Sequence, residues 1–224
     1  MANDMRDLAP RKILFIGNSF TARNDLPGLL TQLAAARGKQ FQHRLISGGG
    51  ASLRTHWNAG EAAKAIAEGQ YDDVVLQEQS TLPIKNARRM HENVRLFDEA
   101  IKHAGAKTVL YMTWARQHAP ESQQAITEAY TSIGRELGAL VVPVGLAWQS
   151  FLGNHDQPVL HDPDQSHPTL AGSYLAAAVF LAALFQENPV GIDGEVTGLA
   201  KKDRGLLQRA AWKVGKSILP KLGD

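Results

Sequence analysis

The chain has 224 residues, a formal net charge of +2 at pH 7 and no cysteine. A chain of this length can bury roughly 70% of its unfolded surface in one core, so disulfide bonds are not needed for stability. The lack of cysteine excludes thiol catalysis and cysteine-based zinc sites, and the small net charge does not indicate nucleic-acid binding.

In chain order, the amino-terminal segment MANDMRDLAPRK is polar and lacks the apolar core of a secretory signal. Short runs rich in Val, Ile and Leu follow and predict five strands, at Lys12–Ile16, Phe41–Ile46, Asp73–Leu76, Thr108–Met112 and Leu140–Val144. Helical patterns lie between them, at Leu26–Ala36, Glu61–Glu68, Ala87–Ala104 and Gln123–Leu137. Apolar strands that alternate with helices predict an α/β fold, a three-layer α/β/α sandwich with a parallel five-stranded sheet.

The most apolar stretch, Pro168–Phe185, is short and Ala-rich, which predicts a buried core helix and no membrane span. Beyond it, apolar residues recur every four positions and predict a docked carboxy-terminal helix: Leu206, Ala210, Val214 and Ile218. The basic residues of this last stretch are expected to form its solvated face. We therefore expect a single cytoplasmic domain over residues 1–224, with a core at about 12–185 and a helical extension at about 195–220.

Ligand sites of such sheets lie at the carboxyl ends of the strands. The first strand ends in Gly17-Asn18-Ser19, which places Ser19 at a sharp turn before a helix. A serine is a weak nucleophile unless a base lies within hydrogen-bond reach. Taken alone, Ser19 is as well explained by capping a helix.

A possible base lies in Asp164-Gln165-Ser166-His167-Pro168, where an acid and a histidine stand three residues apart. That spacing can place both side chains on one side of a turn, with the acid fixing the imidazole tautomer. A surface acid and a helix-capping histidine are the alternative.

The two segments together resemble the GDSL/SGNH hydrolases. In that family the nucleophilic serine follows the first strand, and a D-x-x-H motif near the carboxy terminus supplies acid and base. The resemblance spans residues 12 to about 185 and implies a serine esterase in which Ser19, His167 and Asp164 form the catalytic triad. It also implies an oxyanion hole formed by the N–H groups of Ser19 and of Gly50, in the block Ser47-Gly48-Gly49-Gly50. No cofactor or metal is implied, and the partner is a small-molecule ester.

Two blocks depart from the family pattern. The first block is G-N-S-F where G-D-S-L is usual. The third is Gln77-Glu78-Gln79-Ser80, where many members carry G-x-N-D and its asparagine completes the oxyanion hole. Gln79 falls at the asparagine position and has the same donor chemistry on a longer arm. Gln77 is the reserve candidate, and a glutamine that only tethers neighbouring loops is the alternative.

Further residues at strand ends are candidates for substrate binding. Trp114 and Arg116 follow the fourth strand and could line the mouth of the site, with Arg116 meeting an anionic group. His56 and Trp57 follow the glycine block. The alternative for Trp114 is a tryptophan at the edge of the core, and the alternative for Arg116 is a surface arginine.

Two other functions fit parts of the sequence. Metal-ligand residue types crowd into one loop and would suit a metal-dependent phosphoesterase: His155, Asp156, His161, Asp162, Asp164 and His167. A catalytically idle carbohydrate-binding domain could use the same scaffold. If the chain is an esterase, its substrate could be a sugar acetate, a short-chain acyl ester or a lipid ester. The sequence pattern does not indicate an oligomeric state.

Overall fold

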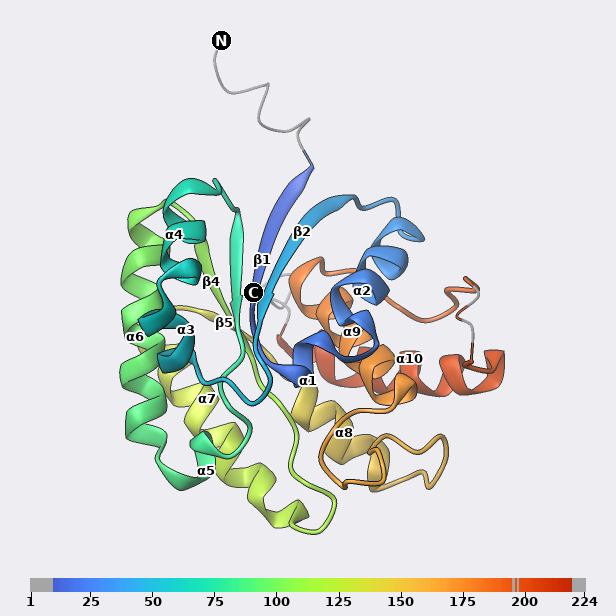
Figure 1. Ribbon diagram of the computed structural model, residues 1–224. Coiled ribbons are helices and arrows are strands. Elements are labelled where there is room, and N and C mark those ends of the chain that lie inside the picture. The colour runs from blue at the N-terminus through green and yellow to red at the C-terminus, as the bar shows by residue number, and fades with distance from the viewer. Residues whose placement is uncertain (1–9, 195, 197, 219–224) are drawn as a thin grey trace, which may run out of the picture.

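A computed structural model describes residues 10–194, 196 and 198–218 (Figure 1). Its centre is a five-stranded parallel sheet in the order β2-β1-β3-β4-β5. The strands are β1 (Arg11–Gly17), β2 (Phe41–Ser47), β3 (Asp73–Leu76), β4 (Lys107–Tyr111) and β5 (Leu140–Val142). The five predicted runs therefore all form strands, and the predicted parallel sheet is confirmed.

Helices cover both faces of this sheet (Figure 1). On one face lie α3 (Leu53–Ala59), α4 (Glu61–Glu68), α5 (Leu82–Lys85), α6 (Ala87–His103) and α7 (Gln123–Leu137). On the other lie α1 (Ser19–Ala22), α2 (Leu26–Ala35), α8 (Val144–Leu152), α9 (Leu170–Leu184) and α10 (Lys201–Gly215). Single turns of 3-10 helix complete the described elements: η2 (Arg23–Asp25), η3 (Pro120–Ser122) and η4 (Lys216–Ile218).

The core forms because β1 is apolar at every central position. Side chains of a strand alternate between the two faces. Ile13 and Phe15 pack under α2 and α9, whereas Leu14 and Ile16 pack under α4 and α6, all four with no exposed surface. Full burial of such a side chain contributes about 1.5–3 kcal/mol, so the central strand is fixed from both sides.

Helix α9 is the buried helix predicted at Pro168–Phe185, and all of its residues from Ala171 to Leu184 are buried. Helix α10 packs against it so closely that a Cβ on Gly215 would lie 2.4 Å from the Ala182 Cβ. No helix in the described part of the chain is long and apolar enough to cross a membrane.

The apolar stripe predicted for α10 is displaced by one position. Leu207 and Ala211 are fully buried, whereas Leu206, Ala210 and Val214 are only partly buried at the edge of the same core. The side chain of Ile218 lies outside the described residues. Both sets of residues recur every four positions, so the period alone did not fix which set faces α9.

The prediction that the fifth strand reaches Val144 is wrong. The strand ends at Val142 because Pro143 has no N–H to donate, and α8 begins at Val144. Helices α3, α5 and α8 were not predicted. The first two are short, with seven and four residues, and α8 was assigned in part to the preceding strand.

The strand register determines which loops meet at the carboxyl edge. Gly17 pairs with Ser47 of β2, and Ile16 pairs with Leu76 of β3. The segments that follow these three strands therefore leave the sheet at the same level and lie side by side.

Candidate active site

Ser19 begins α1 directly after β1. The Asn18 side chain caps this helix by accepting a hydrogen bond from the Phe20 N–H at 3.0 Å. The turn requires glycine at position 17, since a Cβ there would lie 2.6 Å from both Gln77 Oε1 and Thr21 Oγ1. Asn18 therefore caps the helix, and the Ser19 hydroxyl is available for another role.

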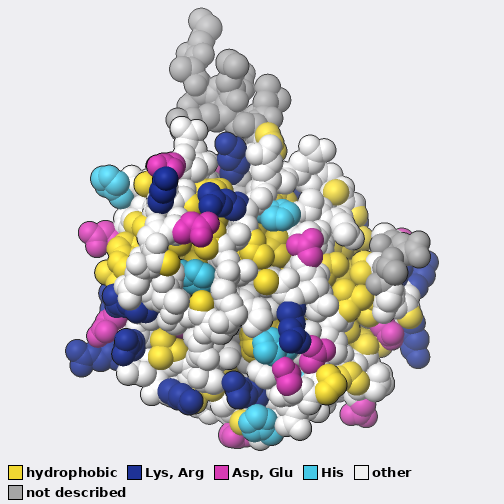
Figure 2. All heavy atoms as spheres, viewed as in Figure 1, with side chains coloured by type: hydrophobic (Ala, Val, Ile, Leu, Met, Phe, Trp, Pro, Cys, Tyr) yellow, Lys and Arg dark blue, Asp and Glu magenta, His cyan; other side chains and the backbone are white. Residues whose placement is uncertain are grey.

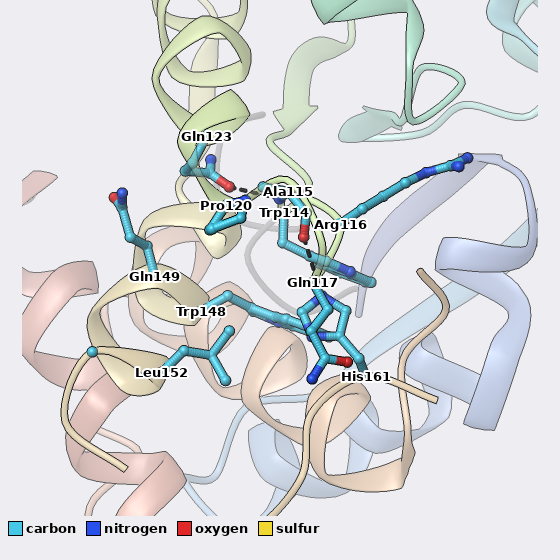
Figure 3. A pocket seen from close by; sticks show the side chains of 11 residues that line it. Trp114, Ala115, Arg116, Gln117, Pro120, Gln123, Trp148, Gln149, Leu152 and His161 are labelled. Carbon is cyan, nitrogen blue, oxygen red and sulfur yellow. Dashed lines mark hydrogen bonds between the residues drawn. The ribbon is translucent and has the colours of Figure 1, made fainter. Parts of the chain in front are cut away.

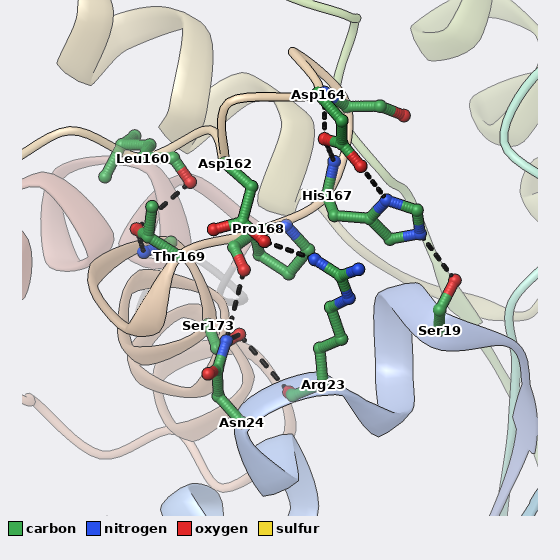
Figure 4. Close-up of polar contacts among 12 residues, drawn as sticks. Ser19, Arg23, Asn24, Leu160, Asp162, Asp164, His167, Pro168, Thr169 and Ser173 are labelled. Carbon is green, nitrogen blue, oxygen red and sulfur yellow. Dashed lines mark hydrogen bonds and ion pairs between the residues drawn. The ribbon is translucent and has the colours of Figure 1, made fainter.

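The hydroxyl of Ser19 faces the imidazole of His167, with 2.8 Å between Ser19 Oγ and His167 Nε2 (Figure 4). On the other side of the ring, His167 Nδ1 lies 2.5 Å from Asp164 Oδ2. A carboxylate can only accept, so Nδ1 carries the proton and Nε2 is left as the acceptor for the serine hydroxyl. The structure thus brings together Ser19, His167 and Asp164, which the sequence singled out.

The loop before α9 holds Asp164 in this orientation. Asp164 Oδ1 accepts the backbone N–H groups of Ser166 at 3.0 Å and His167 at 2.9 Å. The loop closes on itself where the Asp162 N–H donates to the His167 carbonyl at 2.8 Å. The hydrogen bond from the His167 side chain is the main reason that the pKa of Asp164 lies well below its ordinary value. The carboxylate is therefore ionised whenever the imidazole can act as a base.

The glycine block after β2 lies beside the Ser19 turn. Asn18 Nδ2 donates to the Ala51 carbonyl at 3.0 Å, which ties the two segments together. Gly50 has a φ of +65°, in the left-handed region that favours glycine. Among the described residues, neither the Ser19 N–H nor the Gly50 N–H donates to another protein group.

The two glutamines after β3 have different surroundings. Gln77 is fully buried. Its Oε1 accepts from the Asn18 N–H at 2.9 Å and from the Thr21 hydroxyl at 3.0 Å, and its Nε2 donates to the Glu78 carbonyl at 2.5 Å. Gln77, the reserve candidate for the oxyanion hole, is thus engaged beneath the Ser19 turn.

Gln79 is only partly buried. Its Oε1 accepts from the Thr81 N–H at 2.9 Å and from the Leu82 N–H at 3.1 Å, at the start of α5. Two backbone donors fix which end of the amide is oxygen. Its Nε2 makes no hydrogen bond to another described residue. The oxygen of Gln79 can therefore tether the loop while the nitrogen is available as a donor, so the two roles predicted for Gln79 are compatible.

Two side chains that sequence reasoning did not use support the site. Asn18 joins the serine turn to the glycine block, as described above. Glu78 is fully buried, and its Oε1 accepts the N–H groups of Leu53 at 3.0 Å and Gln79 at 2.7 Å. Burial is the main reason that the pKa of Glu78 is raised. A charged residue directly after an apolar strand was the only sequence signal for this role.

His56 lies beneath the site rather than within its opening. It is 8% exposed, and its Nε2 lies 2.7 Å from the Gly17 carbonyl oxygen. Its neighbour Trp57 packs edge-on against Phe97 of α6. His56 therefore supports the end of β1 and offers little surface to a substrate, whereas Trp57 is partly exposed and packs on α6.

Trp114 belongs to an aromatic stack that starts next to the serine. Phe20 and Trp114 stack with centroids 4.7 Å apart, and Trp114 and Trp148 stack at 3.9 Å. The Phe20 ring also contacts His167 edge-on at 5.3 Å. The Trp114 Nε1 donates to the Ser166 carbonyl at 3.0 Å, which fastens the stack to the histidine loop.

A cavity of about 400 Å³ lies further along this stack (Figure 3). Trp114 and Arg116 line it, as do Trp148 and His161, but Ser19 and His167 do not. Trp114 and Arg116 thus line a cavity that Ser19 and His167 do not line, and their role at the mouth of the substrate site stays a prediction.

Histidine and aspartate side chains of the loop at 155–167 contact different residues. His161 Nε2 lies 3.1 Å from the Ala115 carbonyl oxygen, and Asp162 forms an ion pair with Arg23. Within the described part of the chain, no three His, Cys, Asp or Glu side chains come together in a group that could hold a metal ion. Side-chain placement therefore gives the metal-site hypothesis no support.

Comparison with known proteins places this geometry in a family. A protein from Slackia heliotrinireducens that is described as an SGNH hydrolase has 30% sequence identity and a TM-score of 0.68, over 77% of this chain and 97% of that chain. The chain therefore belongs to the SGNH hydrolases, and at the level of that family it is an ester hydrolase.

More distant structures share the fold. A DUF4886 family protein from Bacteroides uniformis has a TM-score of 0.72 at 20% identity, over 92% of this chain and 94% of that chain. An acetyl xylan esterase from Geobacillus stearothermophilus has a TM-score of 0.56 at 17% identity, over 84% of this chain and 97% of that chain. No protein-family model and no curated protein matched the chain.

Proposed function

We propose that the chain is a serine esterase that removes a small acyl group, such as acetyl, from a hydroxyl-bearing substrate through Ser19, His167 and Asp164. The observation that carries this proposal is the continuous line of contacts from Asp164 Oδ2 to His167 Nδ1 at 2.5 Å and from His167 Nε2 to Ser19 Oγ at 2.8 Å. This is the arrangement that activates a serine for acyl transfer.

The reaction has two steps. In the first, His167 Nε2 takes the Ser19 proton while Oγ attacks the ester carbonyl carbon, and the protonated imidazole then gives that proton to the leaving alcohol. In the second, His167 takes a proton from water, the hydroxide attacks the acyl-serine, and the proton returns to Ser19 Oγ as the acid leaves. Asp164 stabilises the imidazolium in both steps.

The negative charge on the carbonyl oxygen needs donors that are already in place. We assign this role to the N–H groups of Ser19 and Gly50 and to Gln79 Nε2. The support is that none of the three donates to another described protein group.

A small acyl group is favoured by the surroundings of the serine. Phe20 and Trp114 are 3% and 2% exposed and stack face to face beside Ser19. Trp114 also lines the cavity of about 400 Å³ further along the stack, whereas Ser19 and Phe20 do not. A long acyl chain would have to displace this stacked pair to reach that cavity.

The test is an activity screen over acetylated sugars and p-nitrophenyl esters of increasing chain length. Ser19→Ala should lower turnover by roughly a million-fold, and a fluorophosphonate probe should label Ser19 in the wild type. Activity that survives in Ser19→Ala, or labelling at another residue, contradicts the proposal. Loss of activity in EDTA with recovery on adding a divalent ion would favour the metal-dependent phosphoesterase.

A further inference from the structure

A second cavity, of about 530 Å³, lies on the α3, α5 and α6 side of the Ser19 turn. Its volume is in the range of small-ligand sites. The residues that line it are polar apart from Leu82 and include no acid: Ser52, Arg54, Thr55, Asn58, Gln79, Leu82, Asn86, Arg89 and Asn93. Figure 2 shows Lys and Arg side chains gathered over α5 and the first part of α6, at the lower left of that view.

The wall of this polar cavity includes Gln79, one of the groups assigned to the oxyanion hole, although Ser19 and Gly50 do not line it. Ser52 follows Gly50 and Ala51 in the loop after β2, and Gln79 belongs to the loop after β3. These loops flank Ser19, because β1 lies between β2 and β3 in the sheet. A substrate whose ester carbonyl sits at Ser19 could therefore extend its alcohol part into the cavity.

Arg54 is held in place by a buried chain of hydrogen bonds. Its Nε donates to Asn93 Oδ1 at 3.0 Å, and Asn93 Nδ2 donates to Glu78 Oε2 at 2.8 Å. Asn93 and Glu78 are 1% and 0% exposed. Among the residues that the structure describes, these hydrogen bonds use one of the five donors of the guanidinium, and the others are available to a ligand.

The arginines that line the cavity differ from neighbouring arginines in their ion pairs. Arg44 and Arg88, which do not line it, are paired with Glu61 and Glu92. Neither Arg54 nor Arg89 forms an ion pair with any residue in the part of the chain that the structure describes. Two guanidinium groups without carboxylate partners, among several amides and hydroxyls, suit an anionic group on a hydroxyl-rich ligand.

We propose that this polar cavity binds the alcohol part of the substrate and that this part carries a carboxylate, so that the substrate is an O-acetylated sugar acid. This inference rests on the proposed esterase function. Arg54 and Arg89 bind the carboxylate, and the amides of Asn58 and Asn86 bind ring hydroxyls.

The test uses two substrates that differ in one group, a mono-O-acetylated methyl glucuronoside and the corresponding methyl glucoside. The wild type should have a kcat/KM at least about tenfold higher for the glucuronoside at low salt, and the preference should shrink as NaCl screens the charges. Arg89→Gln should lower the ratio of the two kcat/KM values about tenfold. Arg54→Lys, which keeps the charge but loses the planar fork, should lower it less than Arg54→Gln.

Arg88→Gln is the matched control, because Arg88 is the adjacent arginine of α6 and does not line the cavity. This variant should keep the wild-type ratio. A second readout is independent of catalysis: methyl glucuronoside should bind to Ser19→Ala in calorimetry, and Arg89→Gln added to that variant should weaken the binding.

The outcomes separate the two proposals. If p-nitrophenyl acetate is hydrolysed with a requirement for Ser19 but the glucuronoside is not preferred, or the ratio is insensitive to both arginines, the sugar-acid inference is overturned and the esterase stands. If methyl glucuronoside binds in an Arg89-dependent way but no ester is hydrolysed, the cavity keeps its ligand and the esterase function is overturned.

Discussion

Gln77 Oε1 accepts a hydrogen bond from the backbone N–H of Asn18 at 2.9 Å, although the two residues are 59 positions apart. The same oxygen accepts from the Thr21 hydroxyl at 3.0 Å. One buried side chain on the loop after β3 thus holds both ends of the turn that presents Ser19. Its position beneath the turn indicates a residue that orients the nucleophile without touching the substrate.

We therefore expect Gln77→Met to lower kcat by roughly 10–100-fold while KM changes little, since a displacement of about 1 Å at a reacting atom can cost a factor of about 100. The Asn18 N–H would also be buried without an acceptor, which should lower the free energy of unfolding by about 1–3 kcal/mol. Steady-state kinetics and urea unfolding measure both effects, with Gln124→Met on the exposed face of α7 as the control. A variant that loses stability but keeps kcat would show that Gln77 has only a structural role.

Protonation of Asp164 should not limit the activity near neutral pH. The hydrogen bond from His167 lowers the pKa of Asp164 below its ordinary value of 3.8. Any stability that Asp164 contributes is therefore present above that value and is lost only as the pH falls through the lowered pKa. Between pH 5 and 8 Asp164 should thus stay ionised, so its protonation should cause no loss of activity or stability in that range.

Asp164→Asn tests this assignment, because it keeps the shape of the side chain and removes the charge that favours the protonated imidazole. We expect kcat to fall by about 10⁴-fold, measured by steady-state kinetics. Asp162→Asn, in the same loop but paired with Arg23, should keep the wild-type kcat. A similar loss of kcat in both variants would contradict the role assigned to Asp164.

The parts of the molecule that follow from short stretches of sequence were predictable. The five strands were recognisable as apolar runs, and Asp164 and His167 stand three residues apart in one loop. The contact between Ser19 and His167 joins residues that are 148 positions apart. It was predicted from the resemblance to a family, because no local pattern links the two segments.

The supporting contacts could not be read from the sequence because they depend on how distant loops face one another. Gln77 and Gln79 are two positions apart, yet one lies under the serine turn and the other at the start of α5. Strand β3 ends at Leu76, so the alternation of a strand no longer determines where these side chains point. The placement of Arg116 in a cavity that Ser19 does not line depends likewise on how Phe20, Trp114 and Trp148 stack.

Glu78 should make the stability of the protein depend on pH in the opposite direction to Asp164. Burial raises the pKa of Glu78 above its ordinary value of 4.5. Its contribution to stability is then greatest below that value, where the carboxyl is neutral in both states, and is lost as the pH rises through the raised pKa.

The glutamine in Glu78→Gln does not titrate. The difference in the free energy of unfolding, wild type minus variant, should therefore decrease between about pH 5 and pH 8. Urea unfolding at several pH values measures this difference. Glu121→Gln changes an exposed glutamate and should give a difference that varies little over the same range. A wild-type advantage that grows with pH would show that the carboxylate is stabilised by the N–H groups of Leu53 and Gln79 more than it is destabilised by burial.

The final prediction concerns Gln79, whose two amide atoms have separable roles. Oε1 accepts the Thr81 and Leu82 N–H groups at the start of α5, whereas Nε2 is assigned to the oxyanion. Gln79→Glu keeps an oxygen for the helix and replaces the donor by a negatively charged acceptor beside a forming anion. With p-nitrophenyl acetate, which has no carboxylate, it should lower kcat by roughly 100- to 1000-fold or more, with little change in KM, because the charge exists only in the transition state.

Gln79→Ala removes both atoms and should lower kcat by about the same 100- to 1000-fold, and it should also destabilise the protein by leaving the start of α5 without its acceptor. Gln79→Asn should recover part of the activity, since its arm is one methylene shorter. Thermal unfolding of the three variants separates the roles: Gln79→Glu should keep the wild-type melting temperature and Gln79→Ala should not. If Gln79→Glu instead keeps full activity, the oxyanion hole consists of the Ser19 and Gly50 N–H groups alone, and Gln79 only anchors α5.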